Sequence, residues 1–221
     1  MNKPRIALIH ATPVAIEPIR EAFATSWPHA RITNLLDDSL STDLAAEGHL
    51  SEQMIERFVT LARYCAGTGA DAILFTCSAF GTAIEAARTA VAIPVLKPNE
   101  AMFDEALEAG KNLGILSTFA PSIPSMVREL EEEAARRTAR ISIRTATVAD
   151  AMDALQRGDA QAHDRLVHEA SAEFRDCDVL MLAQFSMARA AQQLPRHAGQ
   201  RVLTSPHSAV ARLKRDFAHY A

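Results

Sequence analysis

The chain has 221 residues, 48% of them hydrophobic, and a net charge of −4 at pH 7, so it is long and apolar enough for one large or two small packed domains. Its lysines and arginines are scattered along the sequence, which argues against nucleic acid or a membrane surface as a partner, because such partners require a clustered basic face. No apolar run approaches the ~20 residues that span a bilayer, and the N-terminal sequence lacks the apolar stretch of a secretory signal.

The three cysteines lie far apart and include no Cys-x-x-Cys pair. This pattern disfavours both a disulfide framework and a structural zinc site. We therefore expect a cytoplasmic protein with free thiols. Cys65 and Cys177 do not end predicted strands, so structural or surface roles are favoured for both.

Short apolar segments alternate with longer segments of helical periodicity, which predicts a mainly parallel α/β fold. The predicted strands, in chain order, are Ile6–Ile9, Arg31–Leu35, Ala72–Thr76, Val95–Lys97, Leu113–Leu116, Ile141–Thr145, Val179–Ala183 and Val202–Thr204. Their apolar runs are mostly continuous rather than alternating, as in strands that are covered on both faces.

The predicted helices lie between these strands. In chain order they are Ile16–Ala24, Ser51–Thr68, Gly81–Ala90, Glu100–Ala109, Ser122–Arg137, Ala160–Arg175, Met187–Gln193 and Ser208–His219. Gly69 and Gly110 each follow a predicted helix and suit a left-handed C-terminal cap. Asp159 suits the N-cap of the helix that starts at Ala160.

Three strand patterns recur at an offset of 107 residues (178 − 71). The paired segments are Asp71–Phe80 with Asp178–Met187, Arg5–His10 with Asn112–Ser117, and Pro94–Lys97 with Arg201–Thr204. The repeat predicts two pseudosymmetric parallel-sheet α/β lobes, residues 1–97 with 206–221 and residues 98–205, with the active-site cleft between them. The repeat is broken at one position, where Cys77 in the first half corresponds to Gln184 in the second.

In open parallel sheets, ligands bind beyond the carboxyl ends of the strands. The residues at these ends are mostly small, polar or ionisable, although the strands themselves are apolar. The candidate site residues are His10, Thr12, Cys77, Ser78, Lys97, Ser117, Thr118, Gln184 and Ser186.

Cys77 is the candidate catalytic residue because it ends a strand and precedes a helical pattern. A helix N-terminus favours a thiolate, which could act as a base toward a C–H bond beside a carboxylate. The alternative is a small buried residue without chemistry. His10 could orient Cys77, tune its pKa or carry a proton, and the equally weighted alternative is a hydrogen-bonded or helix-capping histidine.

The other candidates are predicted to bind substrate. Thr12, Ser78, Ser117, Thr118 and Ser186 could, as a set, hold a carboxylate together with backbone N–H groups, although for each one alone an N-cap role is the favoured interpretation. Lys97 either adds positive charge or extends into solvent. The histidines lack metal-ligand spacing, so no metal is expected, and no nucleotide-binding glycine motif or Gly-x-Ser-x-Gly elbow is found.

Three short motifs support a family resemblance: Asp71-Ala-Ile-Leu-Phe-Thr-Cys77-Ser78, Gly114-Ile-Leu-Ser117-Thr118 and Asp178-Val-Leu-Met-Leu-Ala-Gln184. They are similar to the first-cysteine segment, the start of the second half and the second-cysteine segment of the aspartate/glutamate racemase superfamily. This superfamily includes hydantoin racemases, maleate isomerases and arylmalonate decarboxylases. As an architecture, the resemblance covers nearly the whole chain.

The resemblance implies two lobes, a small carboxylate substrate, no cofactor and a homo-oligomer. In two-cysteine members, one thiolate removes the proton alpha to a carboxylate and the opposite thiol returns a proton to the other face. Cys77 matches the first cysteine, but Gln184 stands at the second, and an amide cannot exchange a proton at pH 7. His10 also stands where relatives often have Asp or Asn, and the single cysteine of decarboxylase relatives lies in the second half.

Three functions remain open from the sequence. The leading hypothesis is a cofactor-independent racemase or isomerase-like enzyme that acts at a carbon alpha to a carboxylate, with Cys77 as acid/base and His10 as its partner. An alternative is a one-sided decarboxylase or stereospecific isomerase, which fits the missing second thiol. The other alternative is a non-catalytic protein that binds small carboxylates, for which Gln184 is the support.

Overall fold

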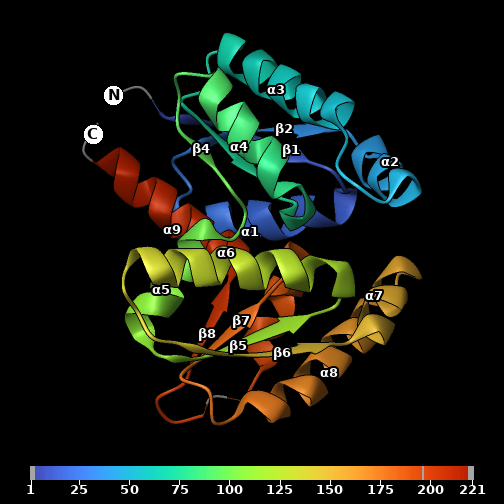
Figure 1. The fold of residues 1–221 in the computed structure, drawn as a ribbon, viewed down its shortest axis with the longest axis vertical. Helices are drawn as coiled ribbons and strands as arrows, with labels where there is room; N and C mark the ends of the chain where they lie inside the picture. Colours follow the sequence, from blue (N-terminus) through green and yellow to red (C-terminus); the bar gives the residue numbers. More distant parts are fainter. Residues whose placement is uncertain (1–2, 196, 219–221) are drawn as a thin grey trace. The chain divides into compact units, whose positions relative to one another are not determined.

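The computed structural model describes residues 3–195 and 197–218 (Figure 1). The chain forms two compact units, the first made of Met1–Pro98 with Ala209–Ala221 and the second of Asn99–Ser208. Each unit contains a four-stranded parallel sheet with flanking helices, so the predicted α/β class with two pseudosymmetric lobes is confirmed. His219, the predicted end of the last helix, lies outside the described residues.

The sheet of the first unit has the order β2-β1-β3-β4. Its strands are β1 (Arg5–His10), β2 (Arg31–Leu36), β3 (Ala72–Phe75) and β4 (Val95–Leu96). Helices α3 (Glu52–Gly67) and α4 (Gly81–Ala90) cover one face, where Ile9 and Phe75 pack with Phe58 of α3. Helix α1 (Ile16–Ser26) lies on the opposite side of this sheet (Figure 1), and Lys214 of α9 (Ser205–Phe217) donates to the Ser26 carbonyl of α1 at 2.8 Å.

The sheet of the second unit has the order β6-β5-β7-β8. Its strands are β5 (Asn112–Ser117), β6 (Ser142–Thr147), β7 (Val179–Leu182) and β8 (Arg201–Thr204). Helices α7 (Ala149–Gln156) and α8 (Ala160–Ser171) pack on one face through a core that includes Leu116 and Leu182. Helices α5 (Glu100–Ala109) and α6 (Ile123–Arg136) pack with Leu113 and Ile115.

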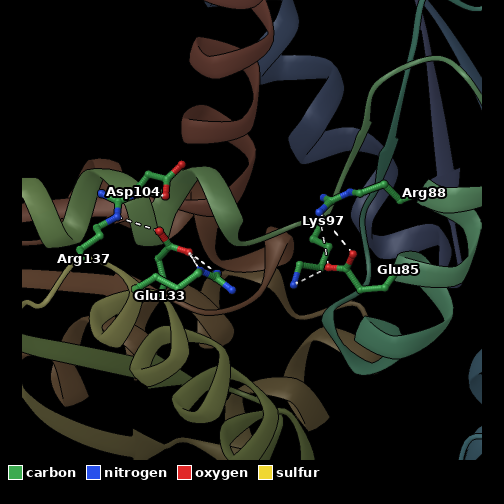
Figure 2. A network of polar contacts seen from close by, with 7 residues as sticks. Glu85, Arg88, Lys97, Asp104, Glu133 and Arg137 are labelled. Carbon is green, nitrogen blue, oxygen red and sulfur yellow. Dashed lines mark hydrogen bonds and ion pairs between the residues drawn. The ribbon is translucent and has the colours of Figure 1, made fainter.

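Figure 2 shows an ion-pair network that joins α5 to the end of α6 in the second unit. Arg137 contacts Asp104 of α5 and donates from Nε to Glu133 of α6 at 2.7 Å. The hydrogen bonds from Arg136 and Arg137 lower the pKa of Glu133 below its ordinary value. The pair of helices is therefore held by charge as well as by apolar packing.

The predicted internal repeat is present in the strand register. Ile6 pairs with Ala72 in the first unit, and Leu113 pairs with Val179 in the second, which keeps the 107-residue offset. Equivalent aspartates also precede β3 and β7: Asp71 accepts from the backbone N–H of Arg5 at 2.7 Å, and Asp178 from that of Asn112 at 2.9 Å. Both units thus begin their central strand pairs with the same hydrogen bond.

Several local predictions are confirmed and others are wrong. Gly69 has φ +79°, as expected of a left-handed cap, and Asp159 accepts from the backbone N–H of Ala162 at 2.9 Å as an N-cap. Gly110 is extended, with φ −172°, so its predicted left-handed cap is wrong. Glycine is needed there for a different reason, because an added Cβ would lie 2.2 Å from Cβ of Asp178.

Two helices were not predicted from the sequence, α2 (Ser39–Glu47) and α7. The segment predicted as a helix over Met187–Gln193 belongs to a longer 3₁₀ helix, η5 (Phe185–Gln193). The other 3₁₀ segments are η1 (Pro13–Ala15), η2 (Ser78–Phe80), η3 (Ala120–Ser122) and η4 (Ala172–Phe174). Within residues 3–195 and 197–218, no helix combines the length and the apolarity needed to cross a membrane.

Candidate active site

Cys77 follows the carboxyl end of β3 and is the N-cap of η2. Its side chain is partly buried, and the thiol is free. Burial raises the pKa of the Cys77 thiol, and this outweighs the lowering by the hydrogen bond from the backbone N–H of Ala79. The expected preference for a thiolate is therefore not what the local environment produces, and the thiol is protonated at neutral pH.

His10 ends β1 with its side chain fully buried. Its Nδ1 lies 2.8 Å from Oγ1 of Thr76, and its Nε2 lies 3.0 Å from Oδ1 of Asn34. Burial lowers the pKa of His10 more than the hydrogen bond to Asn34 raises it, so the neutral ring is favoured. The network then assigns the Nε2–H as donor to Asn34 and the Thr76 hydroxyl as donor to Nδ1.

These bonds define what His10 does in the first unit. Both ring nitrogens are occupied by protein groups, and Thr76 is the residue directly before Cys77. His10 therefore fixes the end of β3 relative to β1 and β2, so that it orients the backbone that carries Cys77. Of the roles open from the sequence, orientation by a hydrogen-bonded histidine is the one that this geometry favours.

Cys77 and His10 line the same small cavity in the first unit. The other lining residues are Ile9, Ala11, Leu40, Phe58 and Phe75. The space between these side chains is too narrow for a water molecule. Apolar side chains thus lie beside Cys77, which is only partly buried as a residue.

Gln184 occupies the equivalent place at the end of β7 in the second unit, where it is the N-cap of η5. Its Oε1 accepts the backbone N–H of Thr118 at 2.8 Å. Its Nε2 donates to Oγ of Ser122 at 2.9 Å and to Oγ of Ser117 at 3.1 Å. Both amide hydrogens and the carbonyl oxygen are thus bound to the loop after β5, which locks the side chain.

The remaining predicted site residues differ in their surroundings. Ser186 has a buried hydroxyl with no hydrogen-bond partner among the described residues. Thr12 is the N-cap of η1 but makes no side-chain cap hydrogen bond, and Ser78 is half-buried at the start of η2. Lys97 lies 3.0 Å from Oε1 of Glu85 on α4 (Figure 2), so a carboxylate already balances its charge.

The structure thus brings together two sets of predicted residues, one in each unit: His10 with Cys77, and Ser117 and Thr118 with Gln184. Sequence reasoning missed the residues that hold these sets, which are Asn34, Thr76 and Ser122. Thr76 and Ser122 stand within a few residues of strand ends, which is the signal that could have found them. Asn34 lies inside β2 and gave no such signal.

A family model described as Asp/Glu/Hydantoin racemase matches residues 17–213 of the sequence. The chain belongs to this racemase family. The match includes both strand-end positions, Cys77 and Gln184, so the resemblance seen in the three short motifs is confirmed. Family membership supports a racemase- or isomerase-type enzyme.

Solved structures with the fold of this racemase-family chain come from several enzymes. Aspartate racemase from Picrophilus torridus is 15% identical, with a TM-score of 0.74, 97% of this chain covered and 94% of the other. Allantoin racemase from Klebsiella pneumoniae is 18% identical, with a TM-score of 0.72 and coverages of 99% and 89%. A liganded mutant of arylmalonate decarboxylase is 17% identical, with a TM-score of 0.64 and coverages of 96% and 92%. No curated protein matches the sequence.

Proposed function

We propose that this member of the racemase family acts without a cofactor on a small carboxylate, such as an amino acid or a derivative. In this proposal Cys77 is the acid/base at the carbon alpha to the carboxylate, and proton transfer occurs at one face of that carbon. The reaction is then a stereospecific isomerisation or a decarboxylation rather than a two-thiol racemisation.

The observation that carries the proposal is the hydrogen bonding of Gln184. It stands 107 residues after Cys77, at the place where a second thiol would act. An amide has no proton to exchange at neutral pH, and this one is bound through both ends to Ser117, Thr118 and Ser122. Proton exchange at that position would require a different residue.

The environment of Cys77 supports proton donation. Burial raises the pKa of its thiol, so the protonated form dominates at neutral pH and can deliver a proton to a carbanion or enolate. His10 is a positioning residue in this scheme, since its ring nitrogens are held by Thr76 and Asn34. The hydroxyls of Thr12 and Ser78 in the first unit are proposed to bind the carboxylate, because the described hydrogen bonds do not occupy them.

The test is NMR in D₂O with the wild type and Cys77→Ala, using both enantiomers of aspartate and glutamate, substituted hydantoins and arylmalonates. We expect deuterium at the alpha carbon or release of CO₂ that depends on Cys77, with the label on one face. The matched control is Cys65→Ala, because Cys65 is buried on α3 and should leave turnover unchanged. Equal labelling of both product enantiomers, or full turnover by Cys77→Ala, would contradict the proposal.

A second candidate function is binding without catalysis, and two observations favour it. Gln184 is locked, and both nitrogens of His10 are bound by protein groups, so neither side chain is free to transfer a proton. Calorimetry with the same compounds would support this function if a carboxylate bound tightly and no turnover followed. The expected homo-oligomer is likewise a proposal, which sedimentation analysis would test.

A further inference from the structure

Helix α2 is held to the first unit by very little apolar packing. It buries one side chain, Leu40, which is fully inaccessible. The following helix α3 buries five side chains. In the second unit, α7 occupies the same place in the order of elements and buries two residues, Ala151 and Ala154. Leu44 of α2 also packs against this core but is only partly buried, and a helix with so few apolar contacts can open locally at low cost.

Leu40 closes the small cavity beside Cys77. Leu40 lines it together with the rings of Phe58 and Phe75. Cys77 and His10 are the polar side chains of the lining, and the other lining side chains are hydrocarbon. In the present conformation a water molecule does not fit. Outward movement of Leu40 would create an apolar pocket that adjoins the thiol.

Arg57 of α3 connects to the segment of α2 at three points. Its Nη2 donates to Oδ2 of Asp37 at 2.7 Å and to Oγ of Ser39 at 2.6 Å, and its Nη1 donates to Asp43. The side chains of Arg57, Asp37 and Asp43 are 31%, 27% and 41% exposed. Ion pairs with this exposure each contribute little to stability. The contacts of Arg57 can therefore hold α2 against α3 and still break when α2 moves.

Two further bonds join this segment to the end of β1. The backbone N–H of Asp37 donates to the His10 carbonyl at 3.0 Å, and the Ser41 hydroxyl donates to the Ala11 carbonyl at 2.8 Å. At its other end, α2 stops at Gly48, whose φ of +70° is left-handed. Movement of α2 would therefore displace residues that line the cavity.

We propose that α2 is a lid over a concealed apolar pocket beside Cys77, that Arg57 is its latch, and that the pocket accepts an apolar substituent of the substrate when Leu40 moves out. This inference rests on the proposed function only in taking Cys77 as the reacting group. It adds a substrate class, a carboxylate whose alpha carbon bears an apolar group that packs against Phe58 and Phe75. It also makes Leu40 the residue that sets the size of that group.

The pocket can be tested without turnover by attaching groups to Cys77 of the full chain. N-phenylmaleimide places an aromatic ring on the sulfur, and iodoacetamide places a small polar group there. Hydrogen exchange followed by mass spectrometry then reports the protection of residues 39–47 in each adduct. We expect residues 39–47 to exchange about three- to tenfold faster in the phenyl adduct, because the ring displaces Leu40. Equal exchange in the two adducts would overturn the proposal.

Two variants separately test Arg57 as the latch and Leu40 as the side chain that closes the pocket. Arg57→Gln should raise the rate at which N-phenylmaleimide modifies Cys77 by about three- to tenfold, whereas Leu40→Ala should raise the preference for N-phenylmaleimide over iodoacetamide. The control is Arg144→Gln, which removes an exposed two-bond ion pair with Asp176 in the second unit. A rate for Arg57→Gln equal to that of Arg144→Gln would overturn the latch, and the adduct experiment decides the pocket even if Arg57→Gln does not fold.

These experiments separate the two proposals. A phenyl-dependent opening of α2 together with no exchange in D₂O would keep the pocket and remove the enzymatic function. Cys77-dependent exchange without opening of α2 would keep the function and overturn the lid.

Discussion

Gln184 donates to the hydroxyl of Ser122 at 2.9 Å, and this bond joins the end of β7 to the loop after β5. Ser122 is 1% exposed, and its hydroxyl also donates to the Phe119 carbonyl at 2.8 Å. The same amide also donates to the Ser117 hydroxyl and accepts the backbone N–H of Thr118. The position that could have carried a second thiol is thus a structural cross-link in this chain.

Gln184→Ala should lower the free energy of unfolding by about 1–3 kcal/mol, because it removes the Gln184 carbonyl oxygen that accepts the buried backbone N–H of Thr118. Urea unfolding measures this change. Gln193→Ala, at an exposed position of the same 3₁₀ helix, is the control and should change stability by less than about 0.5 kcal/mol. A loss no larger than that of the control would show that the cross-link is unimportant.

His10→Leu should remove a pH dependence of stability as well as two hydrogen bonds. Burial lowers the pKa of His10 in the folded state, so the unfolded state binds its proton first. The stabilisation is complete above the unfolded pKa of about 6.5 and is lost as the pH falls through the folded pKa.

The wild type should therefore lose stability below about pH 6.5, and the difference between wild type and His10→Leu should shrink there. Thermal unfolding at several pH values checks this. His29→Leu, at an exposed position, should leave the pH profile unchanged. A constant difference between wild type and His10→Leu at all pH values would contradict the account.

The Cys77 thiol should react slowly with iodoacetamide at neutral pH. Burial raises its pKa, so the midpoint of the rate against pH should lie above about 8.5, the value of an ordinary thiol. Peptide mapping separates the three cysteines. Cys65, whose pKa is raised to about 11 by burial, is the internal reference and should react more slowly still. A midpoint for Cys77 below that of an ordinary thiol would instead favour a thiolate base.

Gly114→Ala should destabilise the second unit. A Cβ at this position would lie 2.4 Å from Cδ1 of Phe174, a fully buried ring, and overpacking of this kind costs about 1–3 kcal/mol. Gly67→Ala is the matched control, because its Cβ would meet no atom within 4 Å and alanine favours a helix. Denaturant unfolding of the pair would refute the packing argument if both variants changed stability equally.

Continuous apolar runs predicted strands such as β3 and β7, whose residues are all buried, and the edge strands β2 and β6 were predicted too, although none of their residues is fully buried. Helix α2 was missed because one buried side chain, Leu40, produces no helical period. Gly110 was misread because a glycine after a helix looks the same in sequence whether it serves a left-handed turn or a close contact. Only the nearby position of Asp178, which the parallel sheet brings next to Gly110, distinguishes a close contact from a left-handed turn.

Strand ends also located the candidate residues, but the bonds among them depend on register. Asn34 reaches His10 because β1 and β2 pair in parallel, with Leu8 opposite Asn34. The protonation of Cys77 depends on how many atoms surround its sulfur, and the spacing of residues in the sequence does not show that number. A helix N-terminus suggested a thiolate, and burial opposed it more strongly.

The division of the chain affects how it can fold during synthesis. The second unit is one continuous stretch, Asn99–Ser208, so all of its contacts are available once that stretch has left the ribosome. The first unit includes Ala209–Ala221, and Lys214 of that segment bonds to Ser26. Helix α1, which is translated early, therefore lacks this contact until the second unit has been made. A nascent chain halted near residue 208 would also leave the Trp27 ring without that of Phe217, which lies 6.1 Å from it in the folded chain.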